Sequence, residues 1–473
     1  MHSSHVVIDE ILHYCRRHGM SEATFGRLAV NDGKLVPRLR EGKSITLSTL
    51  ERVRAFIDNG PPARGEDEPS PERRARGAAE GGAAAAPPTG TAESRQATGK
   101  RDFRFFDNRQ KYLLFVNTCG EKQAVAERVA QELRNVHPQP PALRLFDAGV
   151  GDGTVLARVV RAMHARFPTM PFYVVGKEIS LEDVRLALDK MPDRFFEHPA
   201  TVLVMTNMFY SEAPWLRPRT PTVAASLVWR EVPLMGASSH GFDEQIQDLN
   251  QFLAENWTAH MSAKTGNPIY DRPVVLVIYR QDHRFLLDPV IPRPGAVEAE
   301  YDLVIASQPY RLSAPLDFKA QKVVAPLARA LRMGGRLIGI HSYGRDPGME
   351  IIQRLWPDYD PFRHDRHALL QAVKQAIGPA RRTMNFNTYS DSRSIFRYDM
   401  HTLPNEIEGS IGTSTLFAAW NAAIYMAQVD DQRLKEAVRD GRYIEATQEV
   451  LQRHGGLWFN DESYVISRPA KAA

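Results

Sequence analysis

Cysteine is scarce in this chain. Only Cys15 and Cys119 occur in 473 residues, which excludes a disulfide framework and a cysteine zinc site. No apolar run approaches the roughly eighteen residues of a bilayer span, and the first residues lack a basic-then-apolar secretory pattern. We therefore expect a cytoplasmic protein without a membrane partner. His240 and His283 have no partner ligands at metal-binding spacing, so we expect no metal.

An excess of charge of one sign is also missing. The net charge of +4 is too small for this length to indicate a nucleic-acid partner by itself. Large hydrophobic residues are nearly absent from residues 61–100, so this stretch cannot bury enough apolar area to fold, and we predict a flexible linker. The linker would separate a small all-α domain (1–60) from a catalytic domain (101–473).

Glycine is concentrated in one informative segment, Phe146-Asp-Ala-Gly-Val-Gly-Asp-Gly-Thr154. It follows a short apolar run and precedes a helical pattern over residues 154–167. The spacing differs from the G-x-G-x-x-G of dinucleotide sites, and Asp147 and Asp152 would repel a pyrophosphate. A cationic ligand with a nucleoside end fits better, which indicates S-adenosylmethionine (SAM).

Two further predicted strands end in polar residues. Glu178 follows the apolar run 172–175, and we expect it to accept hydrogen bonds from ribose hydroxyls. Asn207 and Met208 follow the run 201–205, where they would bond adenine and pack on its face. Open α/β sheets bind ligands at the carboxyl ends of their strands, so these residues point to one site.

With these segments the chain resembles the class I SAM-dependent methyltransferases. Residues 301–307 resemble that family's fourth strand, and residues 327–340 resemble its helix, Gly-Gly turn and fifth strand. The resemblance implies an α/β fold with a Rossmann-like seven-stranded sheet, SAM as cofactor and methyl transfer to an unidentified acceptor. With the residues singled out above, the predicted cofactor contacts are Asp147, Gly149, Gly151, Asp152, Gly153, Glu178, Asn207 and Met208.

The segment between Asn207 and the fourth strand is long, which predicts an insertion at about 212–300. Its apolar run at 274–279 is typical of a strand, so the insertion would form a substrate cap or an added part of the sheet. Near the other end of the chain, the run 455–466 fits a closing antiparallel strand, and 417–426 a helix packed in the core.

The candidate catalytic residues follow the fourth and fifth strands. Ser307-Gln-Pro-Tyr310 resembles the Asn/Asp/Ser-Pro-Pro-aromatic motif of amino-methylating nucleic-acid methyltransferases, which implies roles for Gln308 and Tyr310 in holding the acceptor. The alternative is an ordinary tight turn. His341 is a candidate base, with a structural hydrogen-bonding role as its alternative. Tyr112, which precedes a predicted helix at 121–136, is a candidate lid residue.

Residues 1–60 predict four short helices, over 6–15, 21–28, 32–40 and 47–57. Their pattern resembles Cro/repressor-type helix-turn-helix domains, although Pro37 would weaken or kink the third helix. The resemblance implies DNA contacts by Asn31, Lys34, Arg38 and Lys43. The alternative is a docking or dimerisation module, which would make the protein a homodimer.

The sequence therefore predicts a SAM-dependent methyltransferase tethered to a small helical module. Two alternatives stay open. One is a DNA or RNA base methyltransferase that the N-terminal module targets. The other is a DNA-binding transcriptional regulator that senses SAM without turnover.

Overall fold

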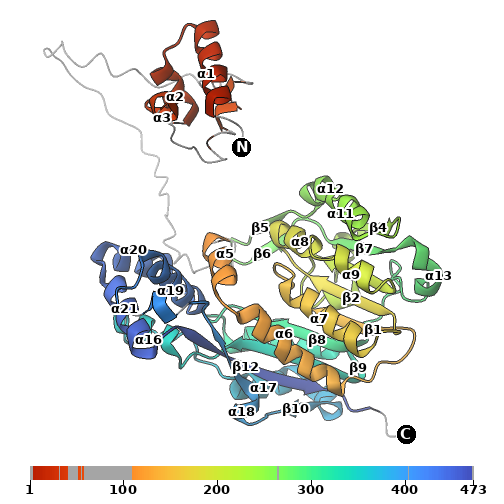
Figure 1. Cartoon of the computed structure of the whole chain (residues 1–473). Coiled ribbons are helices and arrows are strands. Elements are labelled where there is room, and N and C mark those ends of the chain that lie inside the picture. Colours follow the sequence, from red (N-terminus) through yellow and green to blue (C-terminus); the bar gives the residue numbers. More distant parts are fainter. Residues whose placement is uncertain are drawn as a thin grey trace, which may run out of the picture. The chain divides into compact units, whose positions relative to one another are not determined.

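The computed structural model describes residues 4–30, 32–40, 49, 52–54, 56–57, 109–263, 266–402, 404–407 and 409–470. The chain forms two compact units, divided at about residue 95 (Figure 1). The predicted linker at 61–100 lies outside the described residues. No helix within the described ranges has both the length and the apolar character needed to cross a bilayer.

The N-terminal unit contains α1 (Ser4–His18), α2 (Glu22–Val30) and α3 (Leu35–Arg40). Ser21 caps α2, because its Oγ accepts the Thr24 N–H at 3.2 Å. The three helices share one apolar core with Phe56 of the fourth predicted helix, whose ring centroid lies 5.3 Å from that of Phe25. Pro37 is tolerated because it stands in the first turn of α3, where no intrahelical N–H bond is required.

A ten-stranded sheet forms the centre of the C-terminal unit. Along its path the strands are β10 (Asn385–Asn387), β12 (Trp458–Ser467), β9 (Leu331–Ser342), β8 (Tyr301–Ser307), β1 (Leu143–Asp147), β2 (Phe172–Lys177), β3 (Thr201–Thr206), β7 (Val274–Arg280) and β4 (Val228–Leu234). β11 (Ile395–Asp399) pairs with β12. The sheet has ten strands rather than the predicted seven, because β4, β7 and β11 extend it.

The five strands from β3 to β9 are parallel, whereas β12 runs antiparallel to β9 as predicted for the closing strand. The chain leaves β1 towards β2 on one side, while β8 pairs with the opposite edge of β1. The order of the strands therefore reverses at β1 and β8. In open α/β sheets, ligands bind in the crevice at such a reversal.

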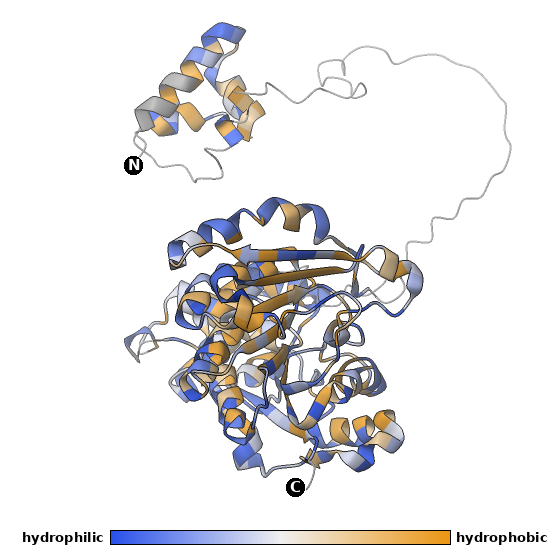
Figure 2. Cartoon of the chain, turned by 90° about the vertical axis from the view of Figure 1, so that its right-hand side faces the viewer, coloured by the Kyte–Doolittle hydropathy of each residue, from blue (hydrophilic) through white to orange (hydrophobic). Residues whose placement is uncertain are grey.

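Both faces of the sheet are buried, which explains the continuous apolar runs of its strands. Figure 2 shows the strands mainly in hydrophobic colours and the outer sides of the helices mainly in hydrophilic ones. One face carries α6 (Glu121–Glu132), α7 (Thr154–Arg166), α8 (Leu181–Leu188), α9 (Pro192–Glu197), α11 (Ser239–Gln247) and α12 (Asn250–Asn256). The other carries the π-helix η5 (Lys319–Val324), α15 (Ala325–Arg329) and α17 (Arg366–Ile377).

The insertion adds to the sheet, which is one of its two predicted forms. β7 pairs antiparallel with β3, and β4 pairs parallel with β7 at the edge. The remainder includes α10 (Pro221–Ala225), a hairpin of β5 (Ala259–Met261) and β6 (Pro268–Tyr270), and α13 (Arg284–Leu287). Every residue of β7 is buried, so the insertion is part of the core of this unit.

A third apolar cluster joins α5 (Arg109–Thr118), α16 (Pro347–Leu355), α19 (Thr413–Met426), α20 (Asp431–Asp440) and α21 (Arg442–His454). Figure 1 shows these helices gathered at one end of the sheet. α19 is the predicted core helix, and its alanines pack against α5 and α16. Phe417 is an exception, because 56% of its surface is exposed.

Gly339 of β9 lets two strands approach closely. A Cβ there would lie 2.0 Å from Cζ of Tyr464 on β12, so we expect Gly339→Ala to destabilise the fold by about 1–3 kcal/mol. Gly412→Ala is the control, because the nearest atom to its Cβ would be Ser414 Oγ at 4.0 Å. Thermal unfolding followed by circular dichroism measures both, and an equal Tm for the two variants would contradict this packing.

Candidate active site

The glycine-rich turn connects β1 to α7 at the reversal of strand order. Gly153 caps α7 with a φ of +80°, and a Cβ there would lie 2.5 Å from the Ala187 Cα of α8. Gly153 therefore brings two helices together. Gly149 differs, because the nearest atom to its Cβ would be the Ser307 carbonyl oxygen at 3.8 Å. The space beside Gly149 is open enough for a ligand to approach the backbone.

Three carboxylates, those of Asp147, Asp152 and Glu178, lie at this turn. Asp147 Oδ1 accepts the Gly149 N–H at 3.1 Å. Glu178 Oε2 accepts the Gly151 N–H at 2.9 Å, and its Oε1 accepts the N–H groups of Ile179 and Ser180 at 2.7 and 2.9 Å. A carboxylate has about four acceptor positions, so Glu178 has one left for a further donor. The predicted residues Asp147, Gly149, Gly151 and Glu178 thus form one site.

Burial sets the charge of these acids. It raises the pKa of Asp147 to about 7, and the nearby Glu178 carboxylate adds to this effect. Burial also acts on Asp152, but Lys122, Thr154 and Lys190 outweigh it and lower the pKa of that carboxyl. Lys190 Nζ lies 3.5 Å from Asp152 Oδ2. An added positive charge would therefore stabilise the ionised form of Asp147.

α5 brings Tyr112 onto the turn. Its hydroxyl lies 3.4 Å from both Oδ1 and the backbone nitrogen of Asp152, and a Cβ on Gly151 would meet it at 3.2 Å. Tyr112 is itself buried. The lid candidate and the glycine turn therefore meet, although forty positions separate Tyr112 from Asp152 in the sequence.

Asn207 and Met208 are held by the insertion. The Asn207 side chain donates to the Arg272 carbonyl at 2.9 Å and accepts the Val274 N–H at 2.9 Å. Met208 is fully buried in the core. Asn207 therefore fastens the start of β7 to the end of β3, and the contact of Asn207 and Met208 with adenine stays a prediction.

Gln308 occupies the tip of β8 with a φ of +47°. Its Nε2 donates to Ser342 Oγ at 3.1 Å and lies 3.4 Å from both carboxylate oxygens of Asp461. Asp461 is fully buried, and burial with the nearby Glu121 and Asp346 raises its pKa well above the ordinary value. The tips of β8, β9 and β12 therefore place an amide, a hydroxyl and a carboxyl together.

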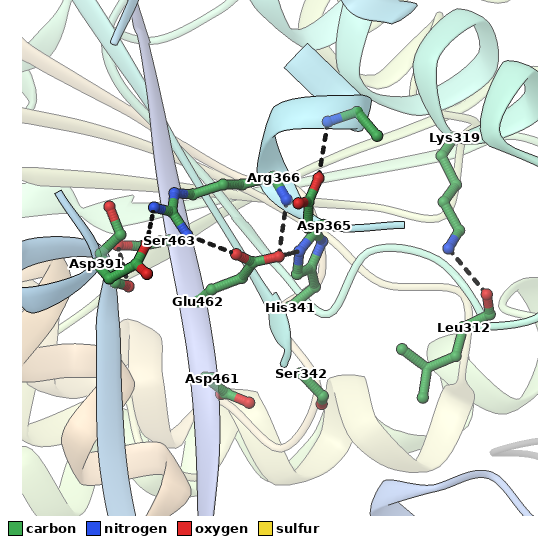
Figure 3. Close-up of polar contacts among 12 residues, drawn as sticks. Leu312, Lys319, His341, Ser342, Asp365, Arg366, Asp391, Asp461, Glu462 and Ser463 are labelled. Atoms are coloured by element: carbon green, nitrogen blue, oxygen red, sulfur yellow. Dashed lines mark hydrogen bonds and ion pairs between the residues drawn. The ribbon is translucent and has the colours of Figure 1, made fainter. Parts of the chain in front are cut away.

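A second chain of contacts lies on the opposite face of β9 and β12 (Figure 3). The Tyr310 hydroxyl lies 2.6 Å from His341 Nδ1, and His341 Nε2 lies 2.6 Å from Glu462 Oε1. Glu462 also accepts the backbone N–H and Nη1 of Arg366 at 2.7 and 2.9 Å. Arg366 also forms an ion pair with Asp391. Because two hydrogen bonds from Arg366 favour the Glu462 carboxylate, Nε2 donates to it and Nδ1 accepts the Tyr310 proton.

Tyr310 points inward rather than offering a stacking surface, since only 9% of it is exposed. Burial raises the pKa of Tyr310 well above its ordinary value, so the phenol is protonated at rest. Lys319 of η5 lies over the ring, with Nζ 5.1 Å from the ring centroid and 2.8 Å from the Leu312 carbonyl (Figure 3). Burial lowers the pKa of Lys319 to about 8.

Several residues that make these contacts were not among the site residues predicted from the sequence. The polar residues 460–463 interrupt the apolar pattern of β12, and this interruption was the signal in the sequence. Arg366 and Lys319 stand in helices whose packing only the fold reveals. Lys122 also lies in the site, beside Glu121 at 3.2 Å and over the Tyr112 ring at 5.7 Å.

The predicted DNA contacts fall on α3 and its flanks. Arg38 is half-exposed and pairs with Asp32 at 2.8 Å, and the Lys34 N–H also bonds Asp32. Asn31 and Lys43 lie outside the described residues. DNA binding by this unit stays a prediction.

No family model and no curated protein matches this chain. Among solved structures, it is similar to a geranyl diphosphate methyltransferase in complex with GPP and sinefungin, with 15% identity, coverage of 73% and 78% of the two chains, and a TM-score of 0.28. It is also similar to PKMT2 from Rickettsia typhi in complex with AdoHcy, with 10% identity, coverage of 73% and 53%, and a TM-score of 0.23.

The buried Lys319 predicts a pH-dependent stability. Its pKa is about 8 in the folded chain against an ordinary 10.5, so the unfolded chain binds more protons between these values and the free energy of unfolding rises with pH. We expect Lys319→Met to raise the Tm at pH 7 and to remove this rise, because no charge is then buried. Lys322→Met, an exposed position of the same π-helix, is the control. Thermal unfolding from pH 7 to 10 measures both variants. The same dependence of Tm on pH in the two variants would refute the prediction.

Proposed function

We propose that this protein is a SAM-dependent methyltransferase. The observation that carries the proposal is the glycine turn at the reversal of strand order, with open space beside Gly149. Asp147 and Glu178 lie directly beside that turn. A ligand bound there would contact the backbone of the turn and the carboxylates together.

The residues present fit SAM better than a phosphate-bearing cofactor. Asp147, Asp152 and Glu178 would repel a pyrophosphate, whereas SAM carries a sulfonium and an ammonium that carboxylates attract. Glu178 retains one acceptor position for a ribose hydroxyl. When bound, SAM supplies an activated methyl group, and the protein's task is to align the acceptor with it.

On the acceptor side, Gln308, which Ser342 and Asp461 hold in place, would position the acceptor at the tip of β8. Tyr310 would take the acceptor's proton while passing its own proton to His341 Nδ1. SAM held beside Asp147 and Glu178 would supply the methyl group to the acceptor atom, and its sulfur would keep the electron pair of the bond to that methyl carbon. The positive charge ends on His341, beside the Glu462 carboxylate.

Cofactor binding tests the proposal directly. We expect the full chain to bind SAM in calorimetry, and Gly149→Ala to weaken binding at least tenfold, because its Cβ would fill the open space beside the turn. The fold of this variant should be unaffected, since no atom lies closer than 3.8 Å to that Cβ. Gly412→Ala is again the control. The cofactor assignment fails if the wild-type chain does not bind SAM, or if folded Gly149→Ala binds it equally well.

The alternatives differ in where a labelled methyl group goes. Wild-type chain and SAM with a radiolabelled methyl group are incubated with lysate separated into nucleic acid, protein, lipid and small molecules. Label in nucleic acid, with binding that falls steeply as salt rises, would support a base methyltransferase. A regulator that only senses SAM would bind it and label no fraction. The inward-facing Tyr310 lacks the exposed ring that stacking on a base requires.

The Tyr310–His341–Glu462 relay predicts a loss of transfer without a loss of cofactor. We expect Tyr310→Phe to reduce labelling of the wild-type acceptor fraction at least tenfold, because general-base assistance typically contributes about 10²–10⁴-fold. Glu462→Gln should act in the same direction, since it removes the anion beside His341. SAM affinity of both variants should stay within about twofold of wild type.

Tyr443→Phe, on α21 away from the relay, controls for the loss of a tyrosine hydroxyl. Thermal unfolding shows whether each variant is folded. Wild-type labelling by folded Tyr310→Phe would rule out the relay, while SAM binding and methyl transfer themselves would stand.

A further inference from the structure

Asp183 is a buried acid that neither the sequence reading nor the proposed function uses. It stands in the first turn of α8, where its N–H bonds the Ser180 cap at 3.3 Å. Only 3% of it is exposed, and its Oδ2 has no hydrogen-bond partner among the described residues. An unpaired buried carboxylate oxygen costs free energy. A hydrogen-bond donor on a bound ligand would offset this cost, which gives a physical reason for a carboxylate at this position.

The groups that face Asp183 come from five elements. Glu178 and Ser180 follow β2, Asp152 belongs to the glycine turn, and Lys122 begins α6. The charge of Asp183 also contributes to the raised pKa values of Tyr112 of α5 and Tyr425 of α19. Asp183 therefore lies beside the turn that the proposed function assigns to the cofactor.

Negative charge exceeds positive charge around this position. The carboxyl groups are those of Asp147, Asp152, Glu178 and Asp183, together with Glu121. The nearby amines are those of Lys122, which is shared with Glu121, and Lys190, which bonds Asp152. A ligand that brings positive charge would relieve this imbalance.

We propose that Asp183 is an additional cofactor-binding residue, whose unpaired Oδ2 accepts a hydrogen bond from the ammonium of SAM. The inference rests on the proposed function, and it selects the amino-acid end of the cofactor rather than the ribose. Glu178, whose carboxylate is mostly occupied by backbone N–H groups, keeps the ribose role. Asp183 would thus supply the anion that Glu178 cannot.

The charge of Asp183 gives the proposal a second observable. Burial and the neighbouring Glu178 raise the pKa of Asp183 to about 7, so part of the population is protonated at neutral pH. An ammonium at Oδ2 favours the ionised form and lowers that pKa. SAM binding at pH 7 therefore releases protons, and its affinity rises from pH 6 to pH 7, below the range in which the ammonium itself loses its proton.

Calorimetry of the full chain at pH 7.0 tests both points. SAM is titrated in phosphate and in Tris, whose ionisation enthalpies differ, so the difference in measured heat gives the number of protons released. We expect Asp183→Asn to bind SAM at least tenfold more weakly than wild type and to release fewer protons. Asp189→Asn, at the exposed end of the same helix, should behave as wild type.

5′-Methylthioadenosine, which lacks the amino-acid end, separates recognition from folding. Asp183→Asn should bind it as the wild-type chain does, which would also show that the variant is folded. SAM affinity of Asp183→Asn within twofold of wild type, or an equal loss for methylthioadenosine, would overturn the inference. If the wild-type chain binds no SAM between pH 6 and 8, the proposed function itself fails.

Discussion

Burial of both faces of the central sheet is the constraint on which the rest of the structure depends. Because helices cover each face, the strands carry apolar side chains on both sides. Polar groups then gather where the strands end. At β1 and β2 these are Asp147 and Glu178, and at β8 and β9 they are Gln308 and Ser342. The chemistry of the protein is therefore concentrated at one edge of the sheet.

The Glu462 contacts are an exception to this rule, because they bury charge within the sheet. Desolvating a carboxylate costs several kcal/mol unless it is well paired, and here His341 and Arg366 supply three short hydrogen bonds. These contacts join β9, β12 and α17, which are far apart in the sequence. If these contacts only held the strands together, the hydrogen bond between His341 and Tyr310, after the end of β8, would not be required. That hydrogen bond is what favours the proposed role in proton transfer.

The sequence was sufficient to predict those parts of the structure that depend on local patterns. The runs ending at Asp147 and Ser307 became β1 and β8 because apolar runs broken by glycine or polar residues mark buried parallel strands. Asn207 could not be judged from its neighbours, since its amide partners are Arg272 and Val274, just before and at the start of β7 in the insertion. Glu462 was missed for the same reason: its partners lie 121 and 96 positions away. Pairing between distant segments leaves no local pattern.

Charge connects the two parts of the proposed site. Around the glycine turn the carboxyl groups outnumber the amines. Burial keeps Asp147 and Asp183 partly protonated near pH 7. Glu462, at the other part, lies beside an imidazole that can accept a proton. In the proposed reaction a single positive charge enters with the sulfonium beside the first group and ends on His341 beside the second. The acids at the glycine turn would then stabilise the positive charge before the transfer, and Glu462 would stabilise it afterwards. A site that only binds SAM would not need the second carboxylate.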